Sequence, residues 1–181
     1  MQLDPMENAL FSATINPLLR GLISRFDREC PEDGSLLLNS LKDFIGAPVS
    51  LCPTCSHISR TIAKPVYELG SRFLRVDKGF MQKQFLNNQY GEAWFRGFGL
   101  MMKGIEKYGV RVPFTPAGPF EIVWNFTSIC NLRCKHCYED AGKKRAELST
   151  EEAKEVLDIL SKIAGIGLPA LSFSGGEPLA R

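Results

Sequence analysis

The sequence lacks a strong excess of charge of either sign. Its 22 lysine and arginine residues stand against 20 aspartate and glutamate residues, so the formal net charge is only +2. The most basic run, Lys143-Lys144-Arg145, is short and typical of a solvated loop. Proteins that neutralise many phosphates carry a larger basic excess. We therefore expect no nucleic-acid partner.

A long apolar run is also lacking. The richest segment, residues 93–105, is interrupted by Arg96 and Lys103 and is too polar for a membrane span. Residues 1–7 are acidic and lack the basic-then-apolar pattern of a signal peptide. These features predict a cytoplasmic protein without a membrane partner. In that compartment the six cysteines are more readily metal ligands or free thiols than disulfide partners.

Apolar residues at helical spacing dominate the first part of the sequence. Asn16 and Pro17 provide an N-cap and a first-turn proline for a helix that ends near Cys30. A second helix follows Ser35 and stops at Gly46. We expect these two helices to pack as a helical hairpin.

Two further helical patterns complete this part. The third runs over residues 58–73, where Pro65 would kink or split it. The fourth runs from about Gly91 to Gly109. Its expected buried stripe is Trp94, Phe98, Met101, Met102, Ile105 and Tyr108. We interpret residues 1–112 as an all-helical accessory domain.

The composition changes at residues 113–119, which hold three prolines and one glycine. Neither a helix nor a central strand tolerates this composition, so we interpret the segment as a linker. Residues 120–126 are rich in β-branched and aromatic side chains and predict a buried strand.

A strand–helix–strand unit is predicted for residues 120–181. Ser149 and Glu152 form a capping box at the start of a helix, and residues 170–173 have the composition of a second strand. Two strands joined through a helix require a parallel sheet, so the predicted class is α/β. Two parallel strands cannot close a core. Because the sequence ends at Arg181, we interpret the chain as truncated.

Three cysteines follow the first predicted strand, in the stretch Thr127-Ser-Ile-Cys130-Asn-Leu-Arg-Cys134-Lys-His-Cys137-Tyr138. Clustered thiolates suit a soft metal, and three ligands leave open one position of a tetrahedral ion or an iron–sulfur cube. The spacing favours iron–sulfur only modestly, and a zinc loop or unmetallated thiols are the alternatives. His136 could complete a zinc site, but it lies between two of these cysteines, a position from which its side chain cannot easily bind the same metal ion.

A glycine motif, Ser174-Gly175-Gly176-Glu177-Pro178, follows the second predicted strand. Glycines let a ligand approach the backbone, exposed carbonyls can accept hydrogen bonds from an ammonium group, and the Glu177 carboxylate can pair with it. Ligands bind at the carboxyl ends of parallel strands. The two motifs together predict a site for an amino-acid-like group beside the metal.

The helical part contains a second cysteine pattern, Cys52-Pro-Thr-Cys55. Such a knuckle supplies half of a zinc or cluster site, which Cys30 or His57 could complete. The alternative is buried or free thiols at the start of a helix. The helical surroundings argue against a thioredoxin-like role. A second metal at Cys52 and Cys55 is therefore a hypothesis.

The complete pattern of residues 127–138, Thr-x-x-Cys-Asn-Leu-x-Cys-x-His-Cys-Tyr, followed after one helix by Gly175-Gly176-Glu177-Pro178, resembles the radical S-adenosylmethionine superfamily. The resemblance covers residues 120–178. In detail the sequence resembles the SPASM/twitch-type branch, which matures peptides and builds cofactors. It implies that residues 120–181 open a partial (β/α) barrel of the TIM type. It also implies that the chain alone lacks full activity.

The resemblance assigns a cluster to the three cysteines. Cys130, Cys134 and Cys137 would ligate three irons of a [4Fe–4S] cluster, and the fourth iron would bind the amino and carboxylate groups of S-adenosylmethionine. An electron from a reductant such as ferredoxin or flavodoxin would cleave the sulfonium. The resulting 5′-deoxyadenosyl radical would take a hydrogen atom from an unknown substrate, a peptide or a cofactor precursor.

The resemblance also assigns residues to S-adenosylmethionine. These residues are His136, Tyr138, Gly175, Gly176, Glu177 and Pro178. The first two would lie near the adenine, and the others match the motif that holds the methionine ammonium.

Two other functions stay open for this sequence. One is an iron–sulfur electron-transfer or sensor protein that binds no S-adenosylmethionine, although such a protein has no use for the ammonium clamp at Glu177. The other is a zinc-dependent interaction module, which would be colourless instead of brown.

Overall fold

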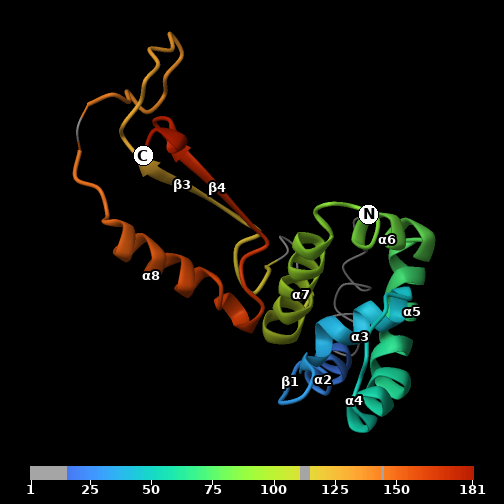
Figure 1. The fold of residues 1–181 in the computed structure, drawn as a ribbon. Helices are drawn as coiled ribbons and strands as arrows, with labels where there is room; N and C mark the ends of the chain where they lie inside the picture. The colour runs from blue at the N-terminus through green and yellow to red at the C-terminus, as the bar shows by residue number, and fades with distance from the viewer. Residues whose placement is uncertain (1–15, 111–114, 144) are drawn as a thin grey trace. The chain divides into compact units, whose positions relative to one another are not determined.

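The computed structural model describes residues 16–110, 115–143 and 145–181. Of the predicted features, residues 1–7, residues 113 and 114 of the linker, and Lys144 lie outside this description. The chain divides into two compact units, Met1–Gly118 and Pro119–Arg181, each with its own secondary structure (Figure 1).

The described part of the first unit consists of helices and one short hairpin. In chain order its elements are α2 (Asn16–Ser24), β1 (Glu29–Cys30), β2 (Gly34–Ser35), α3 (Leu36–Ile45), α4 (Pro53–Ile58), the π-helix η2 (Ser59–Ala63), α5 (Lys64–Leu74), α6 (Lys78–Phe85) and α7 (Gly91–Tyr108). The antiparallel pair β1–β2 shows that the prediction of an all-helical unit is wrong. Cys30, predicted near the end of the first helix, lies in this hairpin.

Local side-chain chemistry explains several helix ends. The Ser35 hydroxyl accepts a hydrogen bond from the Leu38 N–H at the start of α3, and Gly46 ends that helix with a φ of 85°. The stop predicted at Gly46 is therefore confirmed. The sequence reading missed α6, which begins where the Asp77 carboxylate accepts the Phe80 N–H at 2.9 Å.

Pro65 changes the helix without breaking it. A proline nitrogen cannot donate to the carbonyl four residues earlier, so the regular α-helical pattern is disturbed before it. The structure absorbs the disturbance as the π-helical turn Ser59–Ala63, which joins α4 to α5. The predicted kink or split thus takes the form of a π-helical segment.

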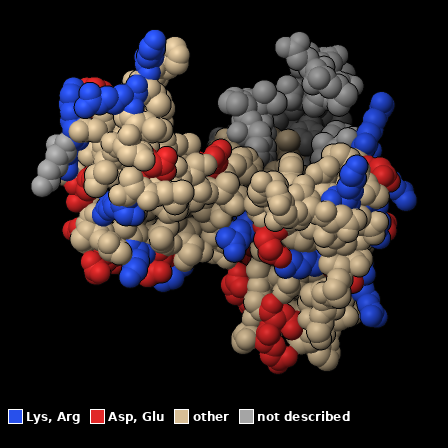
Figure 2. Space-filling model, turned by 45° about the horizontal axis from the view of Figure 1, so that its top comes forward, with Lys and Arg blue, Asp and Glu red and all other residues tan. Residues whose placement is uncertain are grey.

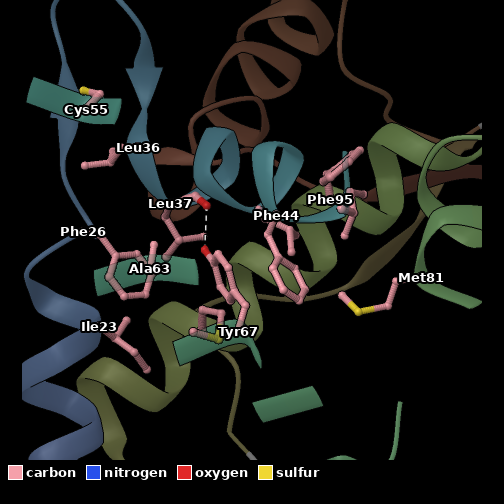
Figure 3. Close-up of a cluster of buried hydrophobic side chains, with 13 residues drawn as sticks. Ile23, Phe26, Leu36, Leu37, Phe44, Cys55, Ala63, Tyr67, Met81 and Phe95 are labelled. Atoms are coloured by element: carbon pink, nitrogen blue, oxygen red, sulfur yellow. Dashed lines mark hydrogen bonds between the residues drawn. The ribbon is translucent and has the colours of Figure 1, made fainter. Parts of the chain in front are cut away.

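The core of the first unit surrounds Tyr67, whose side chain is only 4% exposed (Figure 3). Its ring meets Phe26 and Phe98 edge to face, with centroids 5.7 and 5.9 Å away. Its hydroxyl donates to the Leu37 carbonyl at 2.8 Å and lies 3.1 Å from the Ser40 hydroxyl. Burial raises the pKa of Tyr67, which keeps the hydroxyl protonated.

The predicted buried stripe of α7 is confirmed in part. Met102 is buried, and Phe98, Met101 and Ile105 pack against the core. Trp94 is 49% exposed and Tyr108 is 37% exposed, whereas Phe95, outside the predicted stripe, is buried. Gly104 also lies inside, because a Cβ atom there would come within 2.4 Å of the Thr115 carbonyl oxygen. Residues 115–117 pass close to α7 here, and the Ala117 N–H donates to the Leu100 carbonyl at 3.0 Å. Apolar periodicity alone cannot reveal that contact.

The hairpin expected between the first two helices is also replaced by another arrangement. Helix α2 packs chiefly against α7. The Arg20 guanidinium donates to the carbonyls of Glu106 and Lys107, at 2.7 and 3.1 Å, near the end of α7. These bonds satisfy carbonyls that have no partner within the helix.

The second unit contains the predicted strand–helix–strand unit. Its elements are β3 (Glu121–Thr127), α8 (Thr150–Leu160), η3 (Ile163–Gly165), β4 (Ala170–Gly175) and η4 (Pro178–Ala180). Strands β3 and β4 pair in parallel, and the capping box of Ser149 and Glu152 is formed. Both predictions are confirmed. The sheet has two strands and does not close into a barrel within the described residues.

The surface carries charges of both signs. On the face shown in Figure 2, basic and acidic side chains are interspersed. Within the described parts of the chain, every helix is too short or too polar to cross a membrane.

The Tyr67 hydroxyl gives a test of the core. Replacing Tyr67 by Phe keeps the ring packing but removes a buried donor, so the free energy of unfolding should fall by about 1–2 kcal/mol. Urea denaturation of the whole chain measures this change. The matched variant Tyr90→Phe alters a side chain that is 63% exposed and should change stability little. Equal effects of the two substitutions would contradict the buried hydrogen bond.

Candidate functional site

The cysteine loop, residues 128–142, leaves the carboxyl end of β3. Cys130 is half-buried, and Cys134 and Cys137 are exposed. The Leu132 N–H points at the Cys130 sulfur at 3.4 Å, and the Ala141 N–H points at the Cys137 sulfur at 3.5 Å. The loop therefore carries three thiols on one short segment, with backbone N–H groups facing two of the sulfurs.

The base of the cysteine loop is held by the Glu147 carboxylate. One of its oxygens accepts the backbone N–H and the hydroxyl of Ser128, each at 2.6 Å, and the Thr127 hydroxyl donates to both oxygens at 3.1 and 3.2 Å. These hydrogen bonds lower the pKa of Glu147, and the two from Ser128 have the largest effect. The carboxylate therefore stays charged and fixes the point at which the loop leaves the strand.

Arg181 supports the same corner. Its guanidinium lies 3.6 Å from the Glu147 carboxylate and donates to the Phe126 carbonyl at 2.9 Å. It also lies over the Phe126 ring, 4.5 Å from the centroid. The sequence reading missed both Glu147 and Arg181, because neither belongs to a motif and their partners are 19 to 55 residues away.

The glycine motif at the end of β4 lies directly against the start of the cysteine loop. The Gly176 N–H donates to the Thr127 carbonyl at 2.7 Å, and the Glu177 N–H donates to the Ile129 carbonyl at 2.8 Å. A Cβ atom on Gly176 would lie 2.0 Å from the Ile129 oxygen. Only glycine permits this approach. The two motifs meet at the carboxyl ends of neighbouring parallel strands, as predicted.

The remaining residues of the predicted site lie around this junction. The Tyr138 hydroxyl is 2.7 Å from the Ser174 hydroxyl on β4, although Tyr138 is 77% exposed. His136 is exposed. One oxygen of the Glu177 carboxylate accepts the Leu179 N–H at 3.0 Å and caps η4, which Pro178 begins. The roles predicted for these residues toward S-adenosylmethionine stay predictions.

A pocket of about 180 Å³ opens beside the junction, between β3 and residues 139–148. Its wall includes Trp124, Glu139 and Gly176. The Asn125 amide donates to the Glu139 carboxylate at 2.7 Å, which ties the strand to the end of the cysteine loop. The pocket is smaller than the usual range for small-molecule sites, roughly 300–1,000 Å³, so it could hold only part of a large ligand.

A separate set of donor atoms lies in the first unit. It consists of the side-chain sulfur and oxygen atoms of Cys30, Asp33, Cys52 and Cys55, which all lie within 4.8 Å of one another. The second cysteine pattern thus comes together with Cys30. His57 is exposed and outside the set, and Asp33, which the sequence reading missed, occupies the fourth place.

Comparisons with known proteins agree with the motif reading. Residues 124–181 match the family model described as Radical SAM superfamily. Over 62 residues the chain is 50% identical to the Fe-coproporphyrin III synthase of Methanosarcina barkeri. This aligned stretch covers 33% of this chain and 15% of that protein. It is 45% identical over 65 residues to the AdoMet-dependent heme synthase of the same organism, covering 35% of this chain and 18% of that protein.

A third relative is the mycofactocin maturase of Mycolicibacterium smegmatis, 36% identical over 64 residues, with 35% of this chain and 16% of that protein covered. The chain thus matches less than a fifth of the length of these curated relatives. No solved structure gives a match. The resemblance to the radical S-adenosylmethionine superfamily is confirmed over residues 124–181, and the relatives are enzymes by name.

The Glu147 contacts predict how the loop responds to mutation and to pH. Replacing Glu147 by Gln removes the charge, so the Ser128 amide should exchange with solvent about tenfold faster. Because folding lowers the pKa of Glu147, its stabilising effect is present above the unfolded value, about 4.3, and is lost as pH falls through the folded value. Hydrogen exchange read by NMR at several pH values measures both effects.

The matched control is Glu151→Gln, which removes an exposed carboxylate from the first turn of α8. It should leave Ser128 exchange unchanged. If Glu147→Gln leaves the acid-dependent loss of Ser128 protection intact, Glu147 does not hold the loop.

Proposed function

We propose that residues 120–181 form the opening unit of a radical S-adenosylmethionine enzyme, with a [4Fe–4S] cluster on Cys130, Cys134 and Cys137. The observation that carries this proposal is the contact between the two motifs. Two backbone hydrogen bonds, from Gly176 to Thr127 and from Glu177 to Ile129, hold the glycine motif against the cysteine loop. An electron carrier would not need a ligand-binding turn there.

The three cysteines suit a cube with one open position. In a cube each sulfur binds a different iron. The three thiols come from one accessible loop, and backbone N–H groups already face the sulfurs of Cys130 and Cys137. Three ligands leave one iron open.

The residues around the junction would bind and orient S-adenosylmethionine, the ligand of that iron. When bound, the cluster and S-adenosylmethionine supply a one-electron reductive cleavage that yields 5′-deoxyadenosine after hydrogen abstraction. The backbone of Gly175 and Gly176 and the second oxygen of Glu177 would receive the methionine ammonium. Tyr138, whose hydroxyl is hydrogen-bonded to the Ser174 hydroxyl, would hold the far end of the loop near the adenine. His136 would also lie near the adenine.

The whole protein that contains this unit would act on a cofactor precursor or a peptide. The names of two relatives, an Fe-coproporphyrin III synthase and an AdoMet-dependent heme synthase, favour the first of these classes. A cytoplasmic ferredoxin or flavodoxin would supply the electron. The first unit would serve as an accessory domain.

Anaerobic reconstitution of the chain with iron and sulfide tests the proposal. We expect about four iron and four sulfide ions per chain, and loss of most of this iron in Cys130→Ala, Cys134→Ala and Cys137→Ala. Adding S-adenosylmethionine to the dithionite-reduced protein should change its electron paramagnetic resonance spectrum, because a ligand then occupies the open iron. Elemental analysis and this spectrum are the measurements.

Cys52→Ser is the control, since it changes a cysteine of the first unit and should keep the cluster iron. A colourless protein that binds only zinc would contradict the cluster. A full cluster whose spectrum ignores S-adenosylmethionine would favour the electron-transfer alternative.

A further inference from the structure

We propose that Cys30, Asp33, Cys52 and Cys55 bind one zinc ion that fastens the β1–β2 hairpin to α4. Two ligands come from each element. Cys30 ends β1 and Asp33 lies in the turn before β2, whereas Cys52 precedes α4 and Cys55 lies in its first turn. The proposal concerns the first unit and is independent of the cluster in the second.

The distances match a tetrahedral ion. The four donor atoms all lie within 4.8 Å of one another, and the sulfurs of Cys30 and Cys52 are 3.9 Å apart. A Zn–S bond of about 2.3 Å places two sulfurs of a tetrahedron about 3.8 Å apart. A disulfide would need about 2.05 Å. The sulfurs are therefore too far apart for a disulfide and correctly spaced around one ion.

Hydrogen bonds hold the residues of the proposed site in place. The Cys52 N–H donates to one Asp33 carboxylate oxygen at 2.9 Å, which leaves the other oxygen for the ion. The Asn39 amide donates to the Asp33 carbonyl at 2.5 Å and fixes the turn. The Cys55 N–H donates to the Cys52 sulfur at 3.4 Å. Contacts of this kind orient the ligands of metal sites.

The hydrophobic core of the first unit covers one side of the set, because Cys30 and Cys52 pack against that core. Cys55 is only 4% exposed and packs into the core, at the edge nearest the hairpin (Figure 3).

The donor chemistry selects zinc and a structural role. Three thiolates and a carboxylate are ligands that zinc accepts in tetrahedral geometry, and four protein ligands leave no open position. A [4Fe–4S] cube would need a wider spacing of sulfurs, because each would bind a different iron. The ion would thus join two segments that are 22 residues apart and have only short secondary structure of their own.

Zinc analysis of the purified whole chain tests the site. We expect about one zinc ion per chain in the parent protein. At least a tenfold loss is expected in Cys52→Ser and in Asp33→Asn, the second of which keeps the shape of the side chain. Cobalt loaded in place of zinc should give the intense visible bands of a tetrahedral thiolate site. Circular dichroism reports whether each variant remains helical.

Two controls separate this site from the cluster. Cys134→Ser should lose iron and keep zinc, whereas Cys52→Ser should lose zinc and keep iron. Asp77→Asn, at the exposed start of α6, should keep both metals. A folded parent chain without zinc, a Cys30–Cys52 disulfide found by mass spectrometry, or zinc retained in both ligand variants would overturn the proposal.

Discussion

The backbone of β4 comes so close to the end of β3 at Gly175 and Gly176 that no side chain fits between them. A Cβ atom at Gly175 would lie 2.3 Å from the Thr127 carbonyl oxygen, and Gly175 has a φ of 103°. At this approach the Gly176 N–H donates to the carbonyl of Thr127, the last residue of β3, and the Glu177 N–H donates to the carbonyl of Ile129 in the cysteine loop. The Glu147 carboxylate then fixes the other side of the same strand end through Ser128. The proposed cofactor site depends on this junction.

The two groups of cysteines differ in the way that their chemistry requires. Cys130, Cys134 and Cys137 belong to one loop, and two of them, Cys134 and Cys137, are exposed. Cys30, Cys52 and Cys55 come from two segments, are at least half-buried, and gather with Asp33 around one point. The first arrangement suits a cube with a position left open to a ligand, and the second suits a closed ion that stabilises the fold.

Features governed by neighbouring residues could be predicted from the sequence. Such features include the capping box at Ser149, the stop at Gly46 and the parallel pairing forced by a strand–helix–strand order. The family resemblance could also be read from two short motifs, residues 127–138 and 175–178. Features that depend on distant partners could not be read in this way. Asp33 reaches Cys52 across 19 residues, Arg181 reaches Phe126 across 55, and Gly104 of α7 lies against the backbone of Thr115.

In the proposed site, an iron at the cysteine loop binds the amino group of S-adenosylmethionine. Electron–nuclear double resonance of the reduced, reconstituted chain tests this bond directly, with S-adenosylmethionine carrying ¹⁵N at the methionine nitrogen. We expect a ¹⁵N coupling to the cluster that disappears with unlabelled ligand. A complete cluster that shows no such coupling at saturating ligand would contradict it.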